Sequence, residues 1–268
     1  MSQTGQSPSR LPGGLSTSAP GFLFGNLPQP TPARLNLYHN DFNTYAAGDW
    51  TVTTGGTGTS ALIDANGGQL AVTTNNVSAD IQGNELVKKS FAFTTNSQFW
   101  FGINFKLSHA SNSAFMAGVS NTFAALTPTD GVYLSKPAGA ATMNLVIRGS
   151  STSTTLTVGT VVADTFYTMG FYYDGKASPT VYGFSTIPYL NGTAPGGATG
   201  NTAFGYPYFN GGIQLTPAAG AGSQAGTTLA NLPTANLTMG WAIKANTTVA
   251  QVATIDWITC AEEITARF

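Results

Sequence analysis

Short segments in which apolar and polar residues alternate restrict the fold of this chain more than any other feature. In Phe99–Leu107, phenylalanine, isoleucine or leucine stands at every second position, and Gly102, Asn104 and Lys106 separate the last four of them. Successive side chains of a β-strand point to opposite faces of a sheet, so this pattern places the apolar side chains on one face. We therefore expect a strand here with one buried face.

Similar segments, interrupted by glycine, asparagine, aspartate and proline, follow one another from residue 35 to about residue 187 and again near the C-terminus. Asp174-Gly175 is typical of a two-residue hairpin turn, and no repeat of fixed length indicates a propeller. Roughly twelve short strands predict an all-β fold, a two-sheet antiparallel jelly-roll sandwich over residues 35–268. The other expected strands are Trp50–Thr54, Gln69–Thr74, Ser90–Phe93, Ala114–Ser120, Gly131–Ser135, Met143–Arg148, Thr154–Val158, Phe166–Asp174, Thr180–Ile187, Leu237–Lys244 and Val249–Cys260.

Residues 1–34 differ from the rest because they hold six of the 14 prolines. Proline lacks an amide donor and fixes φ, so this stretch forms neither a central strand nor a helix. Its recurring apolar residues have little use in a free linker. We expect an extended N-terminal arm that lies on a surface, with a disordered tail as the alternative. The arm residues that we expect to bind a partner are Phe22, Leu23, Phe24 and Leu27.

Residues 188–235 are rich in glycine, alanine, proline and asparagine, and we interpret them as a long insertion between consecutive strands of the sandwich. Ordinary connections are far shorter, so a stretch of this length indicates a functional segment or one ordered by a partner. It contains a group of large aromatic residues, a type that is common at the centre of protein interfaces. We expect this group to bind a partner: Phe204, Tyr206, Tyr208 and Phe209.

Charged residues are scarce, since only 8% of the chain is Asp, Glu, Lys or Arg, against about 25% in a typical soluble domain. Its 39 threonines and 32 glycines indicate a surface built from hydroxyl, amide and glycine groups. Charged groups are depleted from the centres of protein interfaces. The composition therefore favours a chain that contacts another protein.

The charge balance and hydropathy also bear on the other classes of partner. The net charge of −1 provides no attraction toward nucleic acid, which needs clustered lysine and arginine. No apolar run approaches the roughly 18 residues of a membrane span, and Met1–Gln6 do not resemble a secretory signal. We expect no nucleic-acid or membrane partner, and synthesis in a cytoplasm.

Few residues are available for catalysis or metal binding. Retaining glycosidases need two carboxyl groups about 5–5.5 Å apart, which on one strand means residues i and i+2. No two carboxylates of the chain stand at i and i+2, and the adjacent Glu262 and Glu263 would point to opposite faces. Cys260 is alone, and His39 and His109 have no histidine or cysteine at ligand spacing. We therefore expect no catalytic residues, no metal ligands and no cofactor.

Several segments resemble one known group of proteins. They are Tyr38–Phe42, Tyr45–Thr53, Phe99–Ser108, Asp130–Leu134 and Thr165–Gly175. Together they resemble the structural virion proteins of tailed bacteriophages that adopt a laminin-G or concanavalin-like jelly roll. The resemblance covers about residues 35–187 and 237–260, and the insertion at 188–235 departs from it.

The resemblance implies a non-enzymatic capsid decoration, or cement, protein on the surface of a virion, made in the cytoplasm of a host bacterium. Its partners would be the major capsid protein and further copies of itself, in a homo-oligomer such as a trimer. A carbohydrate-binding adhesion module on a phage fibre or tail is the alternative, because exposed aromatic residues could stack on sugar rings. The candidates for stacking are Tyr172, Tyr173, Tyr182 and the aromatic group at residues 204–209. A sandwich-fold hydrolase is the third hypothesis, and the missing carboxylate pair counts against it.

Overall fold

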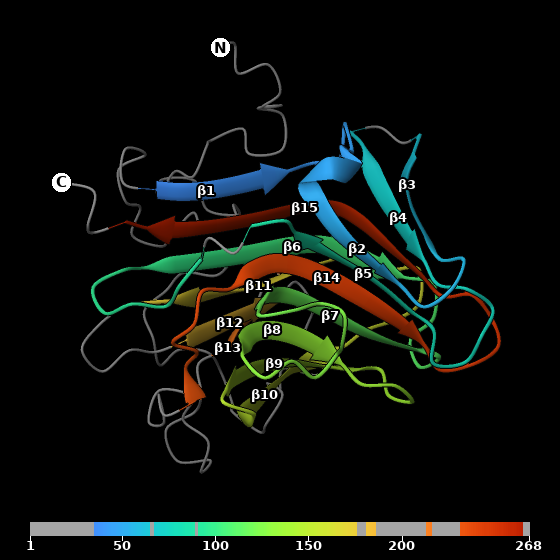
Figure 1. The fold of residues 1–268 in the computed structure, drawn as a ribbon. Helices are drawn as coiled ribbons and strands as arrows, with labels where there is room; N and C mark the ends of the chain where they lie inside the picture. Colours follow the sequence, from blue (N-terminus) through green and yellow to red (C-terminus); the bar gives the residue numbers. More distant parts are fainter. Residues whose placement is uncertain are drawn as a thin grey trace.

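The computed structural model describes residues 35–64, 67–88, 91–175, 181–185, 213–215 and 231–264, which form two antiparallel β-sheets packed face to face (Figure 1). No helix within these ranges is long and apolar enough to cross a membrane. The elements are β1 (Leu35–Asn40), a 3-10 helix η2 (Ala47–Asp49), β2 (Trp50–Thr54), β3 (Thr59–Ile63), β4 (Gln69–Thr73), β5 (Ile81–Leu86), β6 (Phe99–Leu107), β7 (Ser113–Ser120), β8 (Gly131–Lys136), β9 (Thr142–Gly149), β10 (Thr152–Thr160), β11 (Tyr167–Tyr173), β12 (Val181–Ser185), β13 (Ile213–Leu215), β14 (Thr238–Ala245) and β15 (Val252–Glu263).

The strands divide into an eight-stranded and a seven-stranded sheet. The eight-stranded sheet has the order β13-β12-β11-β6-β15-β4-β3, and its eighth strand, β1, pairs with β15 beside β4. The seven-stranded sheet has the order β10-β9-β8-β7-β14-β5-β2. Neighbouring strands in the chain often lie in different sheets, as in a jelly roll. This arrangement confirms the expected all-β, two-sheet antiparallel jelly-roll sandwich.

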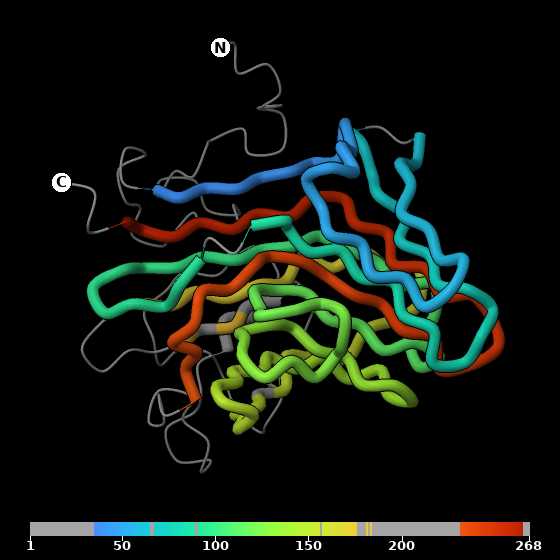
Figure 2. The backbone as a smooth tube through the Cα atoms, in the orientation of Figure 1, coloured from blue at the N-terminus to red at the C-terminus, as the bar shows by residue number. Residues whose placement is uncertain are grey.

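Strand β15 is the longest element and organises the eight-stranded sheet. One of its edges pairs with β6, with a register shift between Ile255 and Trp257. Its other edge pairs with β4 through Val252–Ile255 and with β1 through Ile258–Glu263. Leu35 therefore stands opposite Glu263, so the first strand of the sandwich begins beside the end of the last strand (Figure 2).

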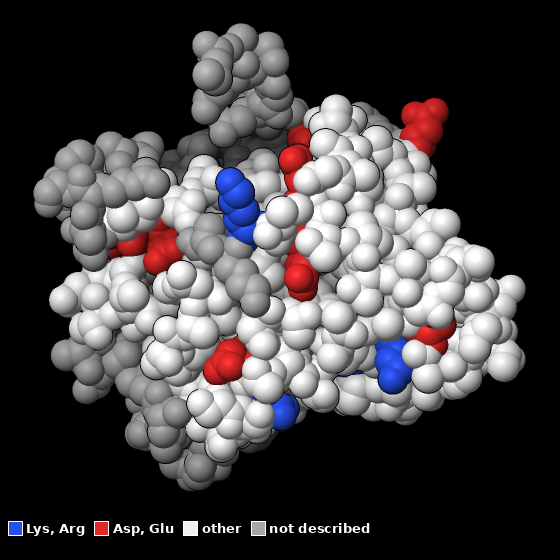
Figure 3. Space-filling model, viewed as in Figure 1, with Lys and Arg blue, Asp and Glu red and all other residues white. Residues whose placement is uncertain are grey.

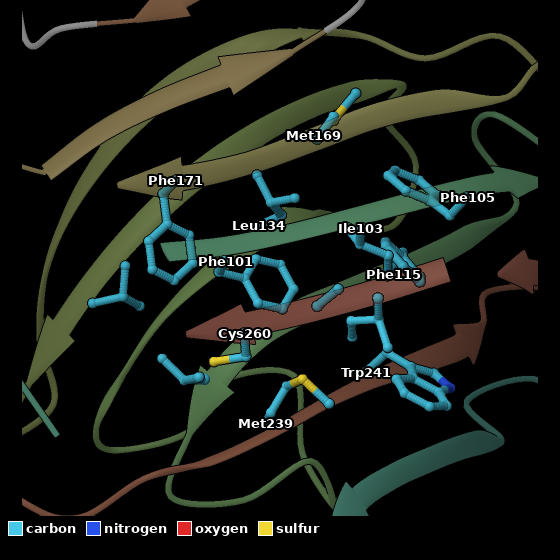
Figure 4. Packing of buried hydrophobic residues seen from close by; sticks show 14 of the residues in the cluster. Phe101, Ile103, Phe105, Phe115, Leu134, Met169, Phe171, Met239, Trp241 and Cys260 are labelled. Carbon is cyan, nitrogen blue, oxygen red and sulfur yellow. The ribbon is translucent and has the colours of Figure 1, made fainter. Parts of the chain in front are cut away.

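The core lies between the sheets, where every second residue of the central strands points inward (Figure 4). Phe101, Ile103 and Phe105 of β6 are fully buried there. Phe105 stacks on Phe115 of β7, with ring centroids 4.7 Å apart. The polar Asn104 lies on the outer face instead, where its amide donates to Thr168 Oγ1 at 2.8 Å. The alternation predicted for this strand is confirmed.

Two local predictions are wrong. Of the expected strand Ser90–Phe93, the described residues Phe91–Phe93 have an isolated bridge between Phe91 and Leu237 instead of a strand. Tyr173 pairs with Val181, so Asp174 and Gly175 do not form a two-residue hairpin loop. Gly175, with φ +63°, meets the backbone of Ser97 closely, and its carbonyl accepts a hydrogen bond from the Asn96 amide. Glycine is required here for this close approach to another segment.

Most of the predicted arm and insertion lies outside the described residues. This applies to all of residues 1–34 and, within residues 188–235, to everything except 213–215 and 231–235. Ile213–Leu215 form β13, which pairs antiparallel with Gly183–Ser185 of β12. The eight-stranded sheet therefore continues into this region of the chain.

The inward and outward faces of β6 should respond differently to truncation. Phe101→Ala or Phe105→Ala should lower the free energy of unfolding by about 3–5 kcal/mol, because each leaves a cavity between the sheets. Asn104→Ala should cost about 1 kcal/mol or less, since it removes one hydrogen bond on the outer face. Urea denaturation of the three variants measures this, and equal losses at Asn104 and Phe105 would contradict the assignment of faces.

Candidate functional site

The first surface that could contact a ligand is the outer face of the seven-stranded sheet. Met116, Tyr133, Val146 and Ala242 lie on it, because they alternate with residues of the inner core. All four are nevertheless buried, and they form one cluster with Phe123. Phe123 comes from the connection between β7 and β8, which passes in front of these strands (Figure 1). The chain therefore covers part of its own outer face.

Glycines make room for this connection on the sheet. A Cβ atom at Gly240 would meet Phe123 Cδ2 at 2.8 Å and the backbone oxygen of Asn84 even more closely. A Cβ atom at Gly83 would meet the backbone oxygen of Phe123. The Glu85 carboxylate accepts a hydrogen bond of 2.6 Å from the Phe123 amide. Gly83 and Gly240, which we call the glycine floor, thus let Phe123 lie directly on the backbone of β5 and β14.

The outer face continues over β9 and β10 as a strip of uncharged polar groups. Ser153, Thr155 and Thr157 are exposed there, and Thr157 Oγ1 donates to Asn144 Oδ1 at 3.1 Å. Tyr133 offers no exposed ring beside this strip, because only 2% of its surface is accessible. The strip therefore presents hydroxyl and amide groups, and the Tyr133 ring beside it is not accessible for stacking on a ligand.

Tyr133 and Arg148 form the polar contact at the margin of the outer cluster. Burial raises the pKa of the Tyr133 hydroxyl, and the charge and hydrogen bond of Arg148 oppose that rise. Arg148 Nε is buried and has no hydrogen-bond partner in the described part of the chain.

Glu262 has the most perturbed carboxyl group among the described residues, at the end of β15. Burial raises its pKa to about 7, against weaker lowering by hydrogen bonds from the Ala92 amide and the Asn36 side chain. The Ala92 amide lies 3.3 Å from Oε2. Glu263, the next residue of the strand, points to the opposite face. This geometry does not supply the pair of carboxyl groups that a glycosidase needs.

The other reactive or ionisable side chains considered, Cys260, Lys136 and His109, are buried or hydrogen-bonded within the fold. Cys260 is buried in the core, and burial raises its pKa. Lys136 Nζ donates to the carbonyls of Ser113, Pro137 and Ala140, and burial lowers its pKa to about 8. His109 Nδ1 lies 3.1 Å from Ser108 Oγ. The described residues contain no group of three or more histidine, cysteine or carboxylate side chains placed to hold a metal.

The second exposed feature is an open edge of the sandwich, where β2 ends the seven-stranded sheet and β3 ends the eight-stranded sheet. We define it by Val52, Ser60, Leu62 and Ile63. Val52 is 41% exposed, Leu62 45% and Ile63 38%. Val52 and Leu62 have the inward orientation of their strands, since they stand opposite the buried Asn84 and Leu70. They remain exposed because no described strand closes the gap between the two sheets here.

A chain of side-chain hydrogen bonds joins the two sheets behind the open edge. Ser60 Oγ donates to Asn84 Oδ1 at 2.9 Å and accepts from Gln82 Nε2 at 3.2 Å. Asn84 Nδ2 donates to the Tyr45 hydroxyl at 2.7 Å. Asn84 belongs to β5, where it stands opposite Val52 of β2. The polar bridge therefore holds β3 against β5, with Val52 beside the contact.

The partner-binding residues predicted from the sequence are not among the residues that the structure describes. These are Phe22, Leu23, Phe24, Leu27, Phe204, Tyr206, Tyr208 and Phe209. The structure instead points to the open edge, which was not predicted. The only signal for it in the sequence is the short run Thr59–Ile63, which combines β-branched residues with apolar neighbours and carries no charge.

Two of the three solved structures compared below, those with TM-scores of 0.50 or more, support the fold. A protein of unknown function from Shewanella oneidensis MR-1 is similar over 100% of this chain and 99% of its own, with a TM-score of 0.53 and 12% identity. An endo-1,3-β-glucanase from Streptomyces sioyaensis is similar over 88% of this chain and 99% of its own, with a TM-score of 0.50 and 10% identity. Peanut lectin with a bound nine-residue peptide covers 85% of this chain and 97% of its own, with a TM-score of 0.49 and 9% identity.

These identities show a likeness of fold alone. The chain matches no protein-family model and no curated protein. The likeness to the glucanase supports a concanavalin-like jelly-roll sandwich and no specific enzyme activity.

The glycine floor beneath Phe123 should be intolerant of a methyl group. Gly240→Ala should lower the free energy of unfolding by about 1–3 kcal/mol, because the new Cβ atom overlaps backbone and the Phe123 ring. Gly48→Ala is the matched control, since nothing lies within 4 Å of a Cβ atom there. Thermal unfolding measures both, and an unchanged Gly240→Ala variant would contradict the packing of Phe123.

Glu262 should make the stability of the sandwich depend on pH. Its pKa is about 7 in the folded protein and about 4.5 in the unfolded chain, so between these values only the folded state holds the proton. The contribution of Glu262 to the free energy of unfolding is therefore fully present below about pH 4.5, and it is lost as the pH rises through about 7. Glu262→Gln removes the titration, so its stability relative to the wild type should rise over this window. A constant difference in urea denaturation between pH 4.5 and 7 would exclude the raised pKa.

Proposed function

We propose that this chain is a non-enzymatic structural protein of a tailed-bacteriophage virion, which decorates the capsid and stabilises its lattice through protein–protein contacts. The proposed partners are the major capsid protein and other copies of the chain. The observation that carries the proposal is a surface with few charged residues (Figure 3), combined with an outer face that the chain itself partly covers. It is supported by the resemblance of residues 35–187 and 237–260 to such virion proteins.

The surface suits contact with protein more than binding of a charged ligand. In the view of Figure 3, lysine, arginine, aspartate and glutamate are scattered singly or in small groups among uncharged residues. Threonine, serine and asparagine pair with protein backbone at little desolvation cost, and the exposed Val52, Leu62 and Ile63 gain from burial. On sequence grounds, the residues around Phe22 and Phe204 remain the proposed contacts with the capsid.

A hydrolase function explains the structure of this sandwich less well. The glucanase of similar fold acts on a 1,3-β-glucan by its name, and a retaining mechanism would need two carboxyl groups about 5–5.5 Å apart. Glu85 lies on the outer face, but its carboxylate holds the Phe123 amide. Glu262 and Glu263 point to opposite faces. These placements supply no acid and nucleophile that face a common ligand.

A carbohydrate-binding adhesion module is the second candidate, and the hydroxyl strip on β9 and β10 is the observation that favours it. Thr155, Thr157 and Asn144 could exchange hydrogen bonds with a sugar. The ring of Tyr133 beside the strip is buried, and the expectation that Tyr172 and Tyr173 are exposed for stacking is wrong, since they are 3% and 1% exposed. Capsid decoration therefore accounts for the surface better. A glycan array separates the two, because a sharp preference at micromolar concentration would favour adhesion.

Attachment to the capsid should resist salt and yield to urea. Salt shortens the screening length from about 10 Å at 0.1 M to about 3 Å at 1 M, but this surface has few charge pairs to screen. Urea weakens both apolar and peptide contacts. Sedimentation of decorated capsids should show almost constant occupancy between about 0.1 and 1 M NaCl. Occupancy should fall in urea below the unfolding midpoint.

Two results would overturn the proposal. Release by salt alone would show that charge pairs hold the protein, and absence of the protein from purified virions by mass spectrometry would reject a virion role. Cryo-electron microscopy of those virions supplies the control, because it distinguishes a capsid position from a fibre or tail position.

A further inference from the structure

Strand β3 is an edge strand with one side unpaired. Its inner side pairs with β4 from Thr59 opposite Thr73 to Ile63 opposite Gln69. No strand in the described ranges pairs with its other side. The free side therefore presents backbone N–H and C=O groups, which are a template for one more strand.

The sequence of β3 lacks the devices that normally protect such an edge. Proteins blunt exposed edges with charged residues, proline, bulges or a covering segment. Thr59–Ile63 contain neither charge nor proline, and the register with β4 is regular. Four of its five residues are exposed, and Ser60 is the exception. This edge is accessible and is chemically compatible with pairing.

A strand added beside β3 would also cover the gap between the two sheets at the open edge. Val52 of β2 and Leu62 of β3 point inward yet are 41% and 45% exposed. A further strand next to β3 would lie over this gap and remove both side chains from water. The apolar gain at Val52 and Leu62 adds to the backbone hydrogen bonds of the new ladder.

We propose that the added strand is β3 of a second copy of this chain, so that two eight-stranded sheets join edge to edge around a two-fold axis. A two-fold axis perpendicular to the sheet keeps the outer faces on the same side, which requires antiparallel pairing centred on a residue. Centring on Ala61 pairs all five residues: Ala61 with itself, Ser60 with Leu62, and Thr59 with Ile63. Shifted registers pair fewer of them.

The charges near the edge allow this pairing. In the Ala61-centred register, Asp64 stands opposite Gly58 of the second copy, and no like charges face each other. Two copies bring their Val52 and Leu62 side chains toward the same gap between the sheets, whereas Ile63, opposite Gln69, lies with Ala61 on the outer face. A strand pair alone is smaller than the roughly 1,200–2,000 Å² buried in a stable interface, so β2 of each copy has to take part. The exposed Val52 is placed to do so.

The proposed register allows a specific test, because residue 61 of one copy stands directly opposite residue 61 of the other copy. Ala61 is exposed on the outer face, so Ala61→Lys and Ala61→Asp leave the core unchanged. Each variant alone places like charges opposite each other and should raise the dimer dissociation constant about tenfold or more. Mixing the two variants places opposite charges together and should restore a heterodimer. Analytical ultracentrifugation of the isolated full-length protein measures all three.

Matched variants on another edge control for general effects of charge. Thr155 is an exposed residue of β10, which ends the seven-stranded sheet on the far side. Thr155→Lys should leave the dissociation constant unchanged. As an independent measurement, Ala61→Cys should form a disulfide-linked dimer under mild oxidation, and Thr155→Cys should not.

The outcomes are distinct from those of the capsid experiments, because no capsid is present. A wild-type protein that stays monomeric well above the concentrations used for capsid binding overturns the β3 pairing, as does a dimer unaffected by Ala61→Lys. Failure of the Lys and Asp variants to combine, with no Ala61→Cys crosslink, also overturns it and would leave a capsid strand as the occupant of this edge.

Discussion

The contact between the inner faces of β6 and β7 is the interaction on which the other features depend. Phe105 of the eight-stranded sheet stacks on Phe115 of the seven-stranded sheet with centroids 4.7 Å apart. Around it the two sheets bury a continuous set of aromatic and aliphatic side chains. In a chain with so few charged groups, this apolar contact has to supply most of the stability. The position of each edge and outer face follows from how these two sheets meet.

Much of the fold can be predicted from the sequence, because alternation is a local property. The segments around β6, β7, β9, β11 and β14 carry an apolar residue at every second position on one face, so one-residue errors in register would expose them. Strands β3 and β5 lack this signal. Thr59–Ile63 do not alternate, and Ile81–Leu86 place Gln82 and Asn84 toward the interior. Those two side chains are tolerated inside because Ser60 and Tyr45, distant in sequence, supply hydrogen bonds.

The candidate site is harder to predict than the fold. The covering of the outer face requires that Phe123, Gly83 and Gly240 meet, and they come from three separate parts of the chain. Nothing local in the sequence indicates this meeting, since glycines in strands are equally typical of bulges. The hairpin turn expected at Asp174-Gly175 is wrong for the same reason. Gly175 serves a contact with Ser97 that only the tertiary structure brings about.

The pairing of β1 with the last half of β15 has a consequence for engineering the chain. Leu35 and Glu263 are opposite one another in the ladder, so a short linker could connect them without crossing the sandwich. New ends could then be opened at the exposed Thr248, in the connection from β14 to β15. Circular permutation is tolerated where termini are close and the cut is exposed. Because this connection lies at the opposite end of β15 from Glu263, a permuted chain would present fused cargo at the far end of the jelly roll.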